Sequence, residues 1–182
     1  QQQLWGSIAV DADITAILTL EHHHSVLSSL LDIPTISTDL LEAPLAKEYN
    51  PIELTETDIA YLQYTSGSTA MPKAAAISHG NLQHSLHETA KTWAYTKTSI
   101  TLNWAPHTHV YGLVCGLLVP LYHGTLAIIM PPKVFINKPV VWLSALSKYR
   151  ATHGGCPNFG YDLCVKKIKK EEYASLNLKH WK

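Results

Sequence analysis

The sequence has few cysteines and few charged residues, and each shortage excludes a class of protein. Three cysteines in 182 residues (Cys115, Cys156 and Cys164) are odd in number and irregularly spaced. They argue against a disulfide framework and favour a reducing compartment such as the cytoplasm. Charged residues make up 15 % of the chain, and 14 Lys and Arg balance 14 Asp and Glu. A zero net charge argues against a nucleic-acid partner held by counterion release.

A long hydrophobic segment is also missing. The longest apolar stretch, residues 110–122, contains Pro120 and is shorter than the roughly 20 residues that span a bilayer. We therefore expect a buried helix and no membrane span. The N-terminus has neither the basic nor the apolar region of a secretory signal, and because it begins at Gln1 we expect the natural gene product to start further upstream. Apolar residues make up 46 % of the chain, enough for a folded core.

Charge is distributed unevenly along the chain. From Lys133 onward there are ten Lys and Arg residues against three Asp and Glu, and the preceding part is acidic. A basic surface of this kind could face phosphates or an acidic protein partner, but a solvated face is the more common reason for a run of charge. The three successive histidines at 22–24 point in different directions on a helix, so we expect a polar loop or a helix start there and no metal site.

Short runs rich in β-branched residues alternate with amphipathic segments. This alternation predicts an α/β fold in which a mostly parallel sheet is flanked by helices. We expect strands at residues 14–20, 33–36, 58–64, 100–104 and 125–130, the last of them buried because it is continuously apolar. We expect helices at residues 4–12, 25–31, 81–93, 111–122, 139–149 and 157–170. Residues 37–57 contain two prolines and predict a surface linker.

The loop after the strand at 58–64 is rich in hydrogen-bond donors. It reads TSGSTAMPK, from Thr65 to Lys73. Gly67 allows a tight turn and a close approach to a ligand, and Lys73 adds a cation. The loop's hydroxyls come from Thr65, Ser66, Ser68 and Thr69. Such donors suit a polyphosphate, although the Gly-Lys-Ser/Thr of P-loop proteins is absent. Composition alone leaves a polar surface loop equally open.

Three segments resemble one superfamily. Residues 64–82, YTSGSTAMPKAAAISHGNL, resemble the phosphate-binding signature YTSGSTGxPKG of adenylate-forming enzymes, which include acyl-CoA synthetases, luciferases and peptide-synthetase adenylation domains. Residues 103–112, NWAPHTHVYG, are similar to their Pro-x-x-His-x-x-Gly segment. Residues 155–164, GCPNFGYDLC, resemble the GGPNFAYxLC of fatty acyl-AMP ligases. The resemblance extends from about residue 8 to residue 181.

The resemblance implies a fold, a reaction and a set of site residues. Fatty acyl-AMP ligases use ATP and Mg²⁺ to convert a fatty acid into an acyl-adenylate, which passes to an acyl carrier protein or to a polyketide or peptide synthase module. The loop residues Thr65, Ser66, Gly67, Ser68, Thr69 and Lys73 would hold the phosphates, with Thr65 or Ser66 assisting Mg²⁺. His109 would lie beside the reacting carboxylate or gate the acyl tunnel. The tunnel would be lined by Gly155, Pro157, Asn158, Phe159 and Tyr161. Ordinary packing is an open alternative for His109, Phe159 and Tyr161.

The chain departs from the family pattern in several places. Ala70 and Ala74 replace glycines, and Val110 replaces the Asp of the ligases' His-Asp-Met-Gly segment. The given sequence ends at Lys182, before the positions at which the family's later adenine, ribose and C-terminal motifs would come. We therefore expect an interior fragment of the adenylate-forming N-terminal domain that is inactive alone. It would comprise a partial N-terminal subdomain and linker at residues 1–57 and an AMP-binding core at residues 58–182. The alternatives are an acyl-CoA synthetase fragment and a degenerate module that binds nucleotide or carrier protein without catalysis.

Overall fold

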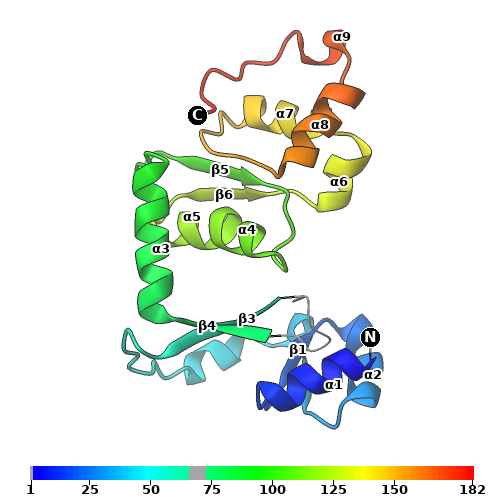
Figure 1. Cartoon of the computed structure of the whole chain (residues 1–182), viewed down its shortest axis with the longest axis vertical. Coiled ribbons are helices and arrows are strands. Elements are labelled where there is room, and N and C mark those ends of the chain that lie inside the picture. The colour runs from blue at the N-terminus through cyan, green and yellow to red at the C-terminus, as the bar shows by residue number, and fades with distance from the viewer. Residues whose placement is uncertain (1, 66–72) are drawn as a thin grey trace. The chain divides into compact units, whose positions relative to one another are not determined.

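The computed structural model describes residues 2–65 and 73–182 (Figure 1). It has the predicted α/β fold, with helices packed on short β-sheets. The chain forms two compact units, Gln1–Asn81 (unit 1) and Leu82–Lys182 (unit 2). The division into subdomains at residue 57 stays a prediction. Over the described residues, no helix is long and apolar enough to cross a membrane.

Unit 1 begins with a helix and a parallel strand pair. Helix α1 (Gln2–Asp11) precedes β1 (Ile17–Thr19), α2 (Glu21–Leu30) and β2 (Thr35–Ser37), and β1 pairs with β2 in parallel. The three histidines lie in the first half of α2. The buried Ser37 hydroxyl donates to Glu21 Oε2 at 2.6 Å, and His24 Nδ1 lies 2.9 Å from Ser37 Oγ, so polar contacts join α2 to β2. The predicted linker contains two 3₁₀ turns, η1 (Thr38–Leu40) and η2 (Ala43–Glu48).

An antiparallel hairpin completes unit 1. Strand β3 (Ile59–Thr65) was expected, whereas its partner β4 (Lys73–Ser78) was not assigned from the sequence. Helix α3 (His79–Thr92) follows directly. Its first turn is capped reciprocally, because the Asn81 N–H donates to Ser78 Oγ and the Ser78 N–H donates to Asn81 Oδ1. The Ser-His-Gly-Asn sequence is therefore a helix start.

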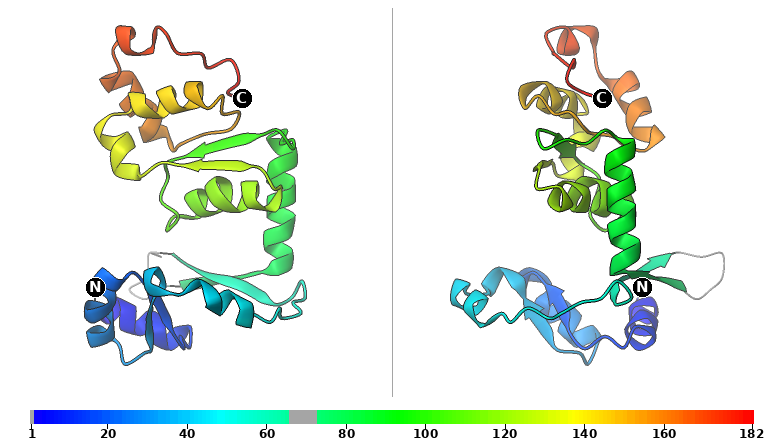
Figure 2. Two further views of the ribbon diagram at one scale, coloured as in Figure 1. Left: turned by 180° about the vertical axis from the view of Figure 1, so that it is seen from behind. Right: turned by 90° about the vertical axis from the view of Figure 1, so that its left-hand side faces the viewer.

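Unit 2 is built around two parallel strands. Strand β5 (Ile100–Asn103) pairs with β6 (Leu126–Ile129), and on its other side Thr101 forms a parallel bridge with His153. Figures 1 and 2 show these strands between one helical layer that includes α4 and another that includes α7. The first layer is a continuous helical run of α4 (Val110–Leu113), the π-helical turn η3 (Val114–Leu118) and α5 (Val119–Tyr122). The second contains α6 (Pro132–Asn137), α7 (Val140–Lys148), α8 (Asn158–Lys167) and α9 (Lys170–Tyr173).

The main core of unit 2 is aromatic. Trp142 of α7 and Phe135 of α6 are fully buried, and Trp104 stacks on Phe135 with ring centroids 3.8 Å apart. Leu102 of β5 and Leu146 of α7 complete the contact between the sheet and this helical layer. A second cluster, Leu86, Ala90 and Val119, packs α3 against α5. These clusters fix the strand ends and helix ends that form the site described below.

One burial prediction was wrong. Strand β6 was expected to be buried throughout, but Leu126 and Ile129 at its two ends are exposed. Among the described strands, β6 pairs only with β5, so one edge of it has no neighbouring strand. A continuous apolar run does not distinguish a central strand from an edge strand.

Candidate functional site

The ends of the predicted phosphate loop lie side by side in the β3–β4 hairpin. Thr65 ends β3 and is the cross-strand partner of Lys73, which begins β4 and is exposed. The hairpin therefore presents the Lys73 ammonium at its loop end. The predicted phosphate residues Ser66, Gly67, Ser68 and Thr69 lie outside the described residues, as does Ala70. Within the described ranges, no group of three or more His, Cys, Asp or Glu side chains could hold a metal ion.

The Pro-x-x-His-x-x-Gly segment forms a tight turn into α4. The His109 N–H donates to the Pro106 carbonyl at 3.1 Å, and His109 Nδ1 accepts a hydrogen bond from the Tyr111 N–H at 3.1 Å. His109 is thus an N-cap whose Nε2 is directed away from the cap. Gly112 packs against the backbone of Pro106, and a Cβ at this position would overlap the Pro106 carbonyl oxygen. The tight turn therefore explains the spacing of Pro106, His109 and Gly112 in this segment.

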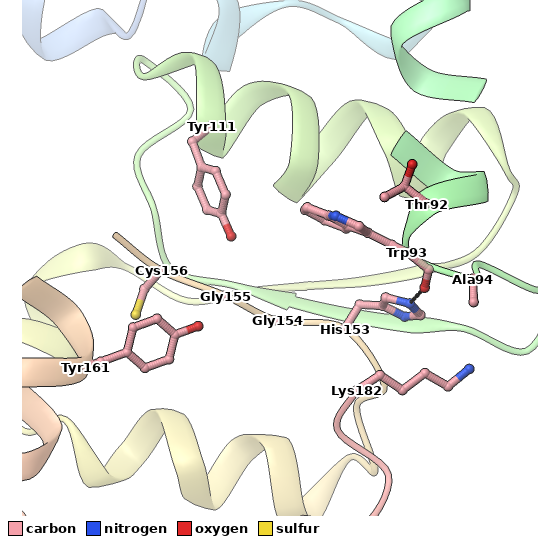
Figure 3. Close-up of a pocket in the computed structure, with 10 residues that line it drawn as sticks. All are labelled: Thr92, Trp93, Ala94, Tyr111, His153, Gly154, Gly155, Cys156, Tyr161 and Lys182. Atoms are coloured by element: carbon pink, nitrogen blue, oxygen red, sulfur yellow. Dashed lines mark hydrogen bonds between the residues drawn. The ribbon is translucent and has the colours of Figure 1, made fainter. Parts of the chain in front are cut away.

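A pocket of about 440 Å³ opens within unit 2 (Figure 3). Its wall is made by the end of α3, by the first turn of α4, by the extended segment after α7 and by α8. The lining residues are 92–94, Tyr111, 153–156, Tyr161 and Lys182. Gly155 and Tyr161, which were predicted as substrate residues, therefore share this pocket. The remaining wall residues, chiefly Tyr111 and His153, were not predicted as site residues.

Two tyrosine hydroxyls approach Gly155 in this pocket. In Figure 3, Tyr111 and Tyr161 point toward the Gly155 backbone from different elements. A Cβ on Gly155 would lie 2.5 Å from the Tyr111 Oη and 3.8 Å from the Tyr161 Oη. Burial raises the pKa of both phenols above the ordinary value, so both remain protonated hydrogen-bond donors at neutral pH. The absence of a side chain at Gly155 leaves room for the Tyr111 hydroxyl, which a Cβ would displace.

His153 holds one end of the pocket in place. It is buried, and its Nε2–H donates to the Trp93 carbonyl at 2.8 Å, because that oxygen can only accept (Figure 3). Its Nδ1 lies 2.8 Å from the Thr152 hydroxyl, and its ring packs on Tyr95 at 4.1 Å. Burial lowers the pKa of His153 despite the hydrogen bond to Trp93. The imidazole is therefore neutral at pH 7 and joins the end of α3 to the edge of the sheet.

The Cys156 thiol in the pocket wall is held in its protonated form. Burial raises the pKa of Cys156 to about 11, and the nearby Cys164 acts in the same direction. Because the thiolate is the nucleophile, we expect iodoacetamide at pH 8 to alkylate Cys156 about 100-fold more slowly than an unperturbed thiol. Peptide mass spectrometry over a time course measures this rate, with the urea-denatured chain as control. Equal rates in the folded and denatured chains would contradict the burial of this thiol.

The other predicted tunnel residues lie at the start of α8, outside the pocket lining. Pro157 is the N-cap of α8, Asn158 is its first residue, and both are exposed. Phe159 is also exposed and meets the edge of Trp104, with ring centroids 5.8 Å apart. Nor does His109 line the pocket, although Tyr111, two residues later, does. The roles given to His109, Pro157, Asn158 and Phe159 stay predictions.

The basic C-terminal part of the chain is solvent-exposed. Its cationic residues Lys133, Lys138, Lys148, Arg150, Lys166, Lys167, Lys169, Lys170, Lys179 and Lys182 are all exposed. Among the described residues, none of them lies within 4.0 Å of a carboxylate, because the only ion pairs join Glu88 to His87 and Lys91. One of these lysines is held to the backbone, since the Lys167 ammonium donates to the Ile136 carbonyl at 3.1 Å. These charges form a mainly solvated face.

Comparison with known proteins places the chain in a family. It matches the AMP-binding enzyme family over residues 7–182. It is 39 % identical over 184 residues to the medium-chain-fatty-acid–[acyl-carrier-protein] ligase JamA of Moorena producens, covering 97 % of this chain and 31 % of that protein. It is 34 % identical over 153 residues to the probable long-chain-fatty-acid–AMP ligase FadD30 of Mycobacterium tuberculosis, covering 81 % of this chain and 26 % of that protein.

The structural similarity covers the whole chain. The fatty acyl-adenylate ligase from L. pneumophila, solved in complex with acyl adenylate and pyrophosphate, matches with a TM-score of 0.90 and 35 % identity, over 100 % of this chain and 33 % of that one. The chain thus spans about a third of the length of these relatives. Because the family match extends over residues 7–182, the chain belongs to the AMP-binding enzyme family, and its resemblance to the fatty acyl-AMP ligases is confirmed.

Proposed function

We propose that this chain is part of a ligase that activates a fatty acid with ATP. The carboxylate attacks the α-phosphorus, a carboxyl–phosphate bond forms, the bond between the α- and β-phosphates breaks, and pyrophosphate leaves. The observation that carries the proposal is the match along the whole chain to a ligase solved with acyl adenylate and pyrophosphate. The thiol of a carrier protein, or of a carrier domain of a polyketide or peptide synthase, then attacks the acyl carbonyl, a thioester forms, the carboxyl–phosphate bond breaks and AMP leaves. The name of the JamA relative supports an acyl carrier protein as the acceptor.

The hairpin end would hold the phosphates. Lys73 is exposed beside Thr65, where nothing among the described residues pairs with its ammonium. A cation and a loop of hydroxyls fit the charge that accumulates on the β- and γ-phosphates as the carboxylate attacks. Thr65 and Ser66 could supply hydroxyl oxygens to Mg²⁺, a hard cation that prefers oxygen ligands. When bound, Mg²⁺ supplies further neutralisation of the phosphates.

The unit 2 pocket would hold the acyl chain. Three aromatic residues, Trp93, Tyr111 and Tyr161, contribute to its wall, and aromatic surfaces bury an alkyl chain favourably. His109 accepts from the Tyr111 N–H through Nδ1, so its Nε2 carries the proton in the neutral ring and can donate to the substrate carboxylate. His109 would thus orient the carboxylate while Tyr111 faces the chain.

The acceptor distinguishes the ligase from an acyl-CoA synthetase. Both enzymes make the same acyl-adenylate, so the two activities differ only in the thiol that accepts the acyl group. Incubating pre-formed acyl-adenylate with the protein and either coenzyme A or a phosphopantetheinylated carrier protein separates the two. Acylation of the carrier protein supports the proposal, and acylation of coenzyme A alone supports the synthetase alternative. A cytoplasmic location accompanies either activity as a prediction.

We expect Lys73→Ala to weaken nucleotide binding about tenfold. Hydrogen bonds to charged groups contribute about 1.5–3 kcal/mol, and exposure at the hairpin end reduces that contribution through solvent screening. Isothermal titration of the chain with ATP and Mg²⁺ measures the affinity. Lys97→Ala is the matched control, because Lys97 is also exposed and lies outside the hairpin.

The same titration tests the proposed function. A non-hydrolysable acyl-sulfamoyl-adenosine replaces ATP as the ligand in a second series. Micromolar binding supports a site for the adenylate within these residues. An unchanged ATP affinity in Lys73→Ala would remove the hairpin from the site. Binding of ATP without binding of the acyl compound would favour the non-catalytic nucleotide-binding alternative, which the replacements at Ala74 and Val110 also favour.

A further inference from the structure

The Tyr111 hydroxyl is an unused hydrogen-bond donor in the wall of the unit 2 pocket. Tyr111 is half-buried and follows the His109 cap, so the turn at Pro106 fixes its position. Among the described residues, its hydroxyl makes no hydrogen bond, and burial raises its pKa. The hydroxyl points at the Gly155 backbone (Figure 3), where the missing side chain leaves room for it, since a Cβ on Gly155 would lie 2.5 Å from the Tyr111 Oη.

Several other polar groups of the pocket already have partners. Both ring nitrogens of His153 are engaged, one by the Trp93 carbonyl and one by the Thr152 hydroxyl. The Gly154 carbonyl accepts from the Trp181 indole at 2.6 Å. Tyr161 and the Cys156 thiol share a hydrogen bond with each other. The Tyr111 hydroxyl is therefore the free donor that lies beside Gly155, with the Tyr161 hydroxyl within 4 Å of the same point. The Lys182 ammonium also lines the pocket but points away from Gly155 (Figure 3).

From this arrangement we propose that the acyl substrate carries an oxygen that accepts a hydrogen bond from Tyr111 beside Gly155. The substrate class is an oxygenated carboxylic acid, with a hydroxyl or oxo group on an aliphatic chain or on a ring. The inference rests on the proposed function, because it assumes that the pocket holds the acyl group. It goes beyond that function by distinguishing such acids from plain alkanoic acids.

The physical reason is the cost of an unmade hydrogen bond. A plain alkyl chain that fills the pocket removes water from the Tyr111 hydroxyl and offers no hydrogen-bond acceptor in its place. A site built to hydrogen-bond an oxygen discriminates strongly against the analogue that lacks it. Because the pocket is open to solvent on one side, we expect a modest preference of about tenfold for the oxygenated ligand. Tyr111 is protonated at neutral pH, so the preference persists across the neutral range.

Two ligand pairs that differ by one oxygen test the inference. The N-acyl sulfamoyl-adenosines made from 8-hydroxyoctanoic and octanoic acid form the aliphatic pair. Those of 3-(4-hydroxyphenyl)propanoic and 3-phenylpropanoic acid form the ring pair. Isothermal titration gives the affinity of each for the wild-type chain, for Tyr111→Phe, which removes only the hydroxyl, and for Tyr122→Phe. Tyr122 is partly exposed and lies outside the pocket, so it is the matched control.

The wild-type chain should bind the oxygenated member of at least one pair about tenfold more tightly. Which pair shows the preference identifies the chain or the ring as the carrier of the oxygen. The preference should disappear in Tyr111→Phe and survive in Tyr122→Phe. Equal affinities within both pairs, or a preference that survives in Tyr111→Phe, overturn the inference and leave the proposed function intact. Failure of a folded chain to bind all four ligands overturns both.

Discussion

Replacing Trp142 by Ala should lower the unfolding free energy of unit 2 by about 3–5 kcal/mol, the range for truncating a large buried aromatic residue. Trp142 is fully buried between two other aromatic rings. It meets Phe135 edge-on, with centroids 5.6 Å apart, and meets Trp181 in the same way at 5.2 Å. Its removal leaves a cavity between Phe135 of α6 and Trp181 of the C-terminal segment, whose indole is held by a hydrogen bond to the Gly154 carbonyl, so little collapse can offset the loss.

The same substitution should disturb the pocket. The Trp142 ring lies 6.0 Å from the Tyr161 ring, centroid to centroid, and Tyr161 lines the pocket wall. Loss of the support behind Tyr161 should therefore weaken ligand binding under conditions in which the variant is still folded. Urea denaturation followed by circular dichroism gives the stability, and titration with the acyl-sulfamoyl-adenosine gives the affinity.

Two further variants make this prediction specific. Trp142→Phe should cost less than about 1 kcal/mol, because the lost volume is partly offset by removal of the indole N–H, which has no hydrogen-bond partner among the described residues. Trp5→Ala deletes the same group from a half-exposed position on α1 and should cost less than about 1 kcal/mol. An equal loss for Trp142→Ala and Trp5→Ala would contradict the assignment of Trp142 to the core.

The sequence predicted the helices and strands that have a clear hydrophobic period. It missed a strand that forms only by pairing with its neighbour and a helix too short to show a period. Strand β5 and helix α7 were placed within one or two residues, because β-branched alternation and an amphipathic period with a leading proline identify them. Three of the six residues of strand β4 are alanine, which has a low β propensity, and pairing with β3 makes this segment a strand. Helix α6 has six residues, fewer than two turns, so it shows too little periodicity to detect.

The sequence motifs identified some of the residues that line the pocket but missed others. The GGPNF-like segment correctly directed attention to Gly155 and Tyr161, which share the pocket. Tyr111 and His153 are about 40 residues apart in sequence, and only the packing of α4 and the sheet edge brings them to one pocket. Tyr111 lies within the Pro-x-x-His-x-x-Gly segment that contains His109, so that segment could have indicated Tyr111 as a site residue. His153 carried no comparable signal, because a single His between Thr and Gly has no pattern of its own.

The turn at Pro106 explains why a glycine ends the Pro-x-x-His-x-x-Gly segment. The substitution Gly112→Ala tests this explanation and should cause the second large loss of stability. A methyl group at residue 112 would overlap the Pro106 carbonyl oxygen and would lie 2.7 Å from the Ala105 carbonyl oxygen. Both obstacles are backbone atoms, and Ala105 is fixed by two hydrogen bonds at 3.1 Å to the side chain of the buried Asn103. Because no flexible side chain can move aside, we expect a loss of about 3 kcal/mol.

Replacing a different glycine, Gly6, by alanine should raise the stability of the chain. Gly6 lies inside α1 with no heavy atom within 4 Å of the Cβ position, so Gly6→Ala should stabilise the chain by about 0.5–1 kcal/mol through helix propensity alone. Denaturation curves of the two variants and the wild type measure both changes. Because the turn orients Tyr111, Gly112→Ala should also lose ligand affinity in its folded fraction, whereas Gly6→Ala should not. If Gly112→Ala were as stable as the wild type, close packing at Pro106 could not be the reason for the motif, and the placement of Tyr111 in the pocket would lose its structural basis.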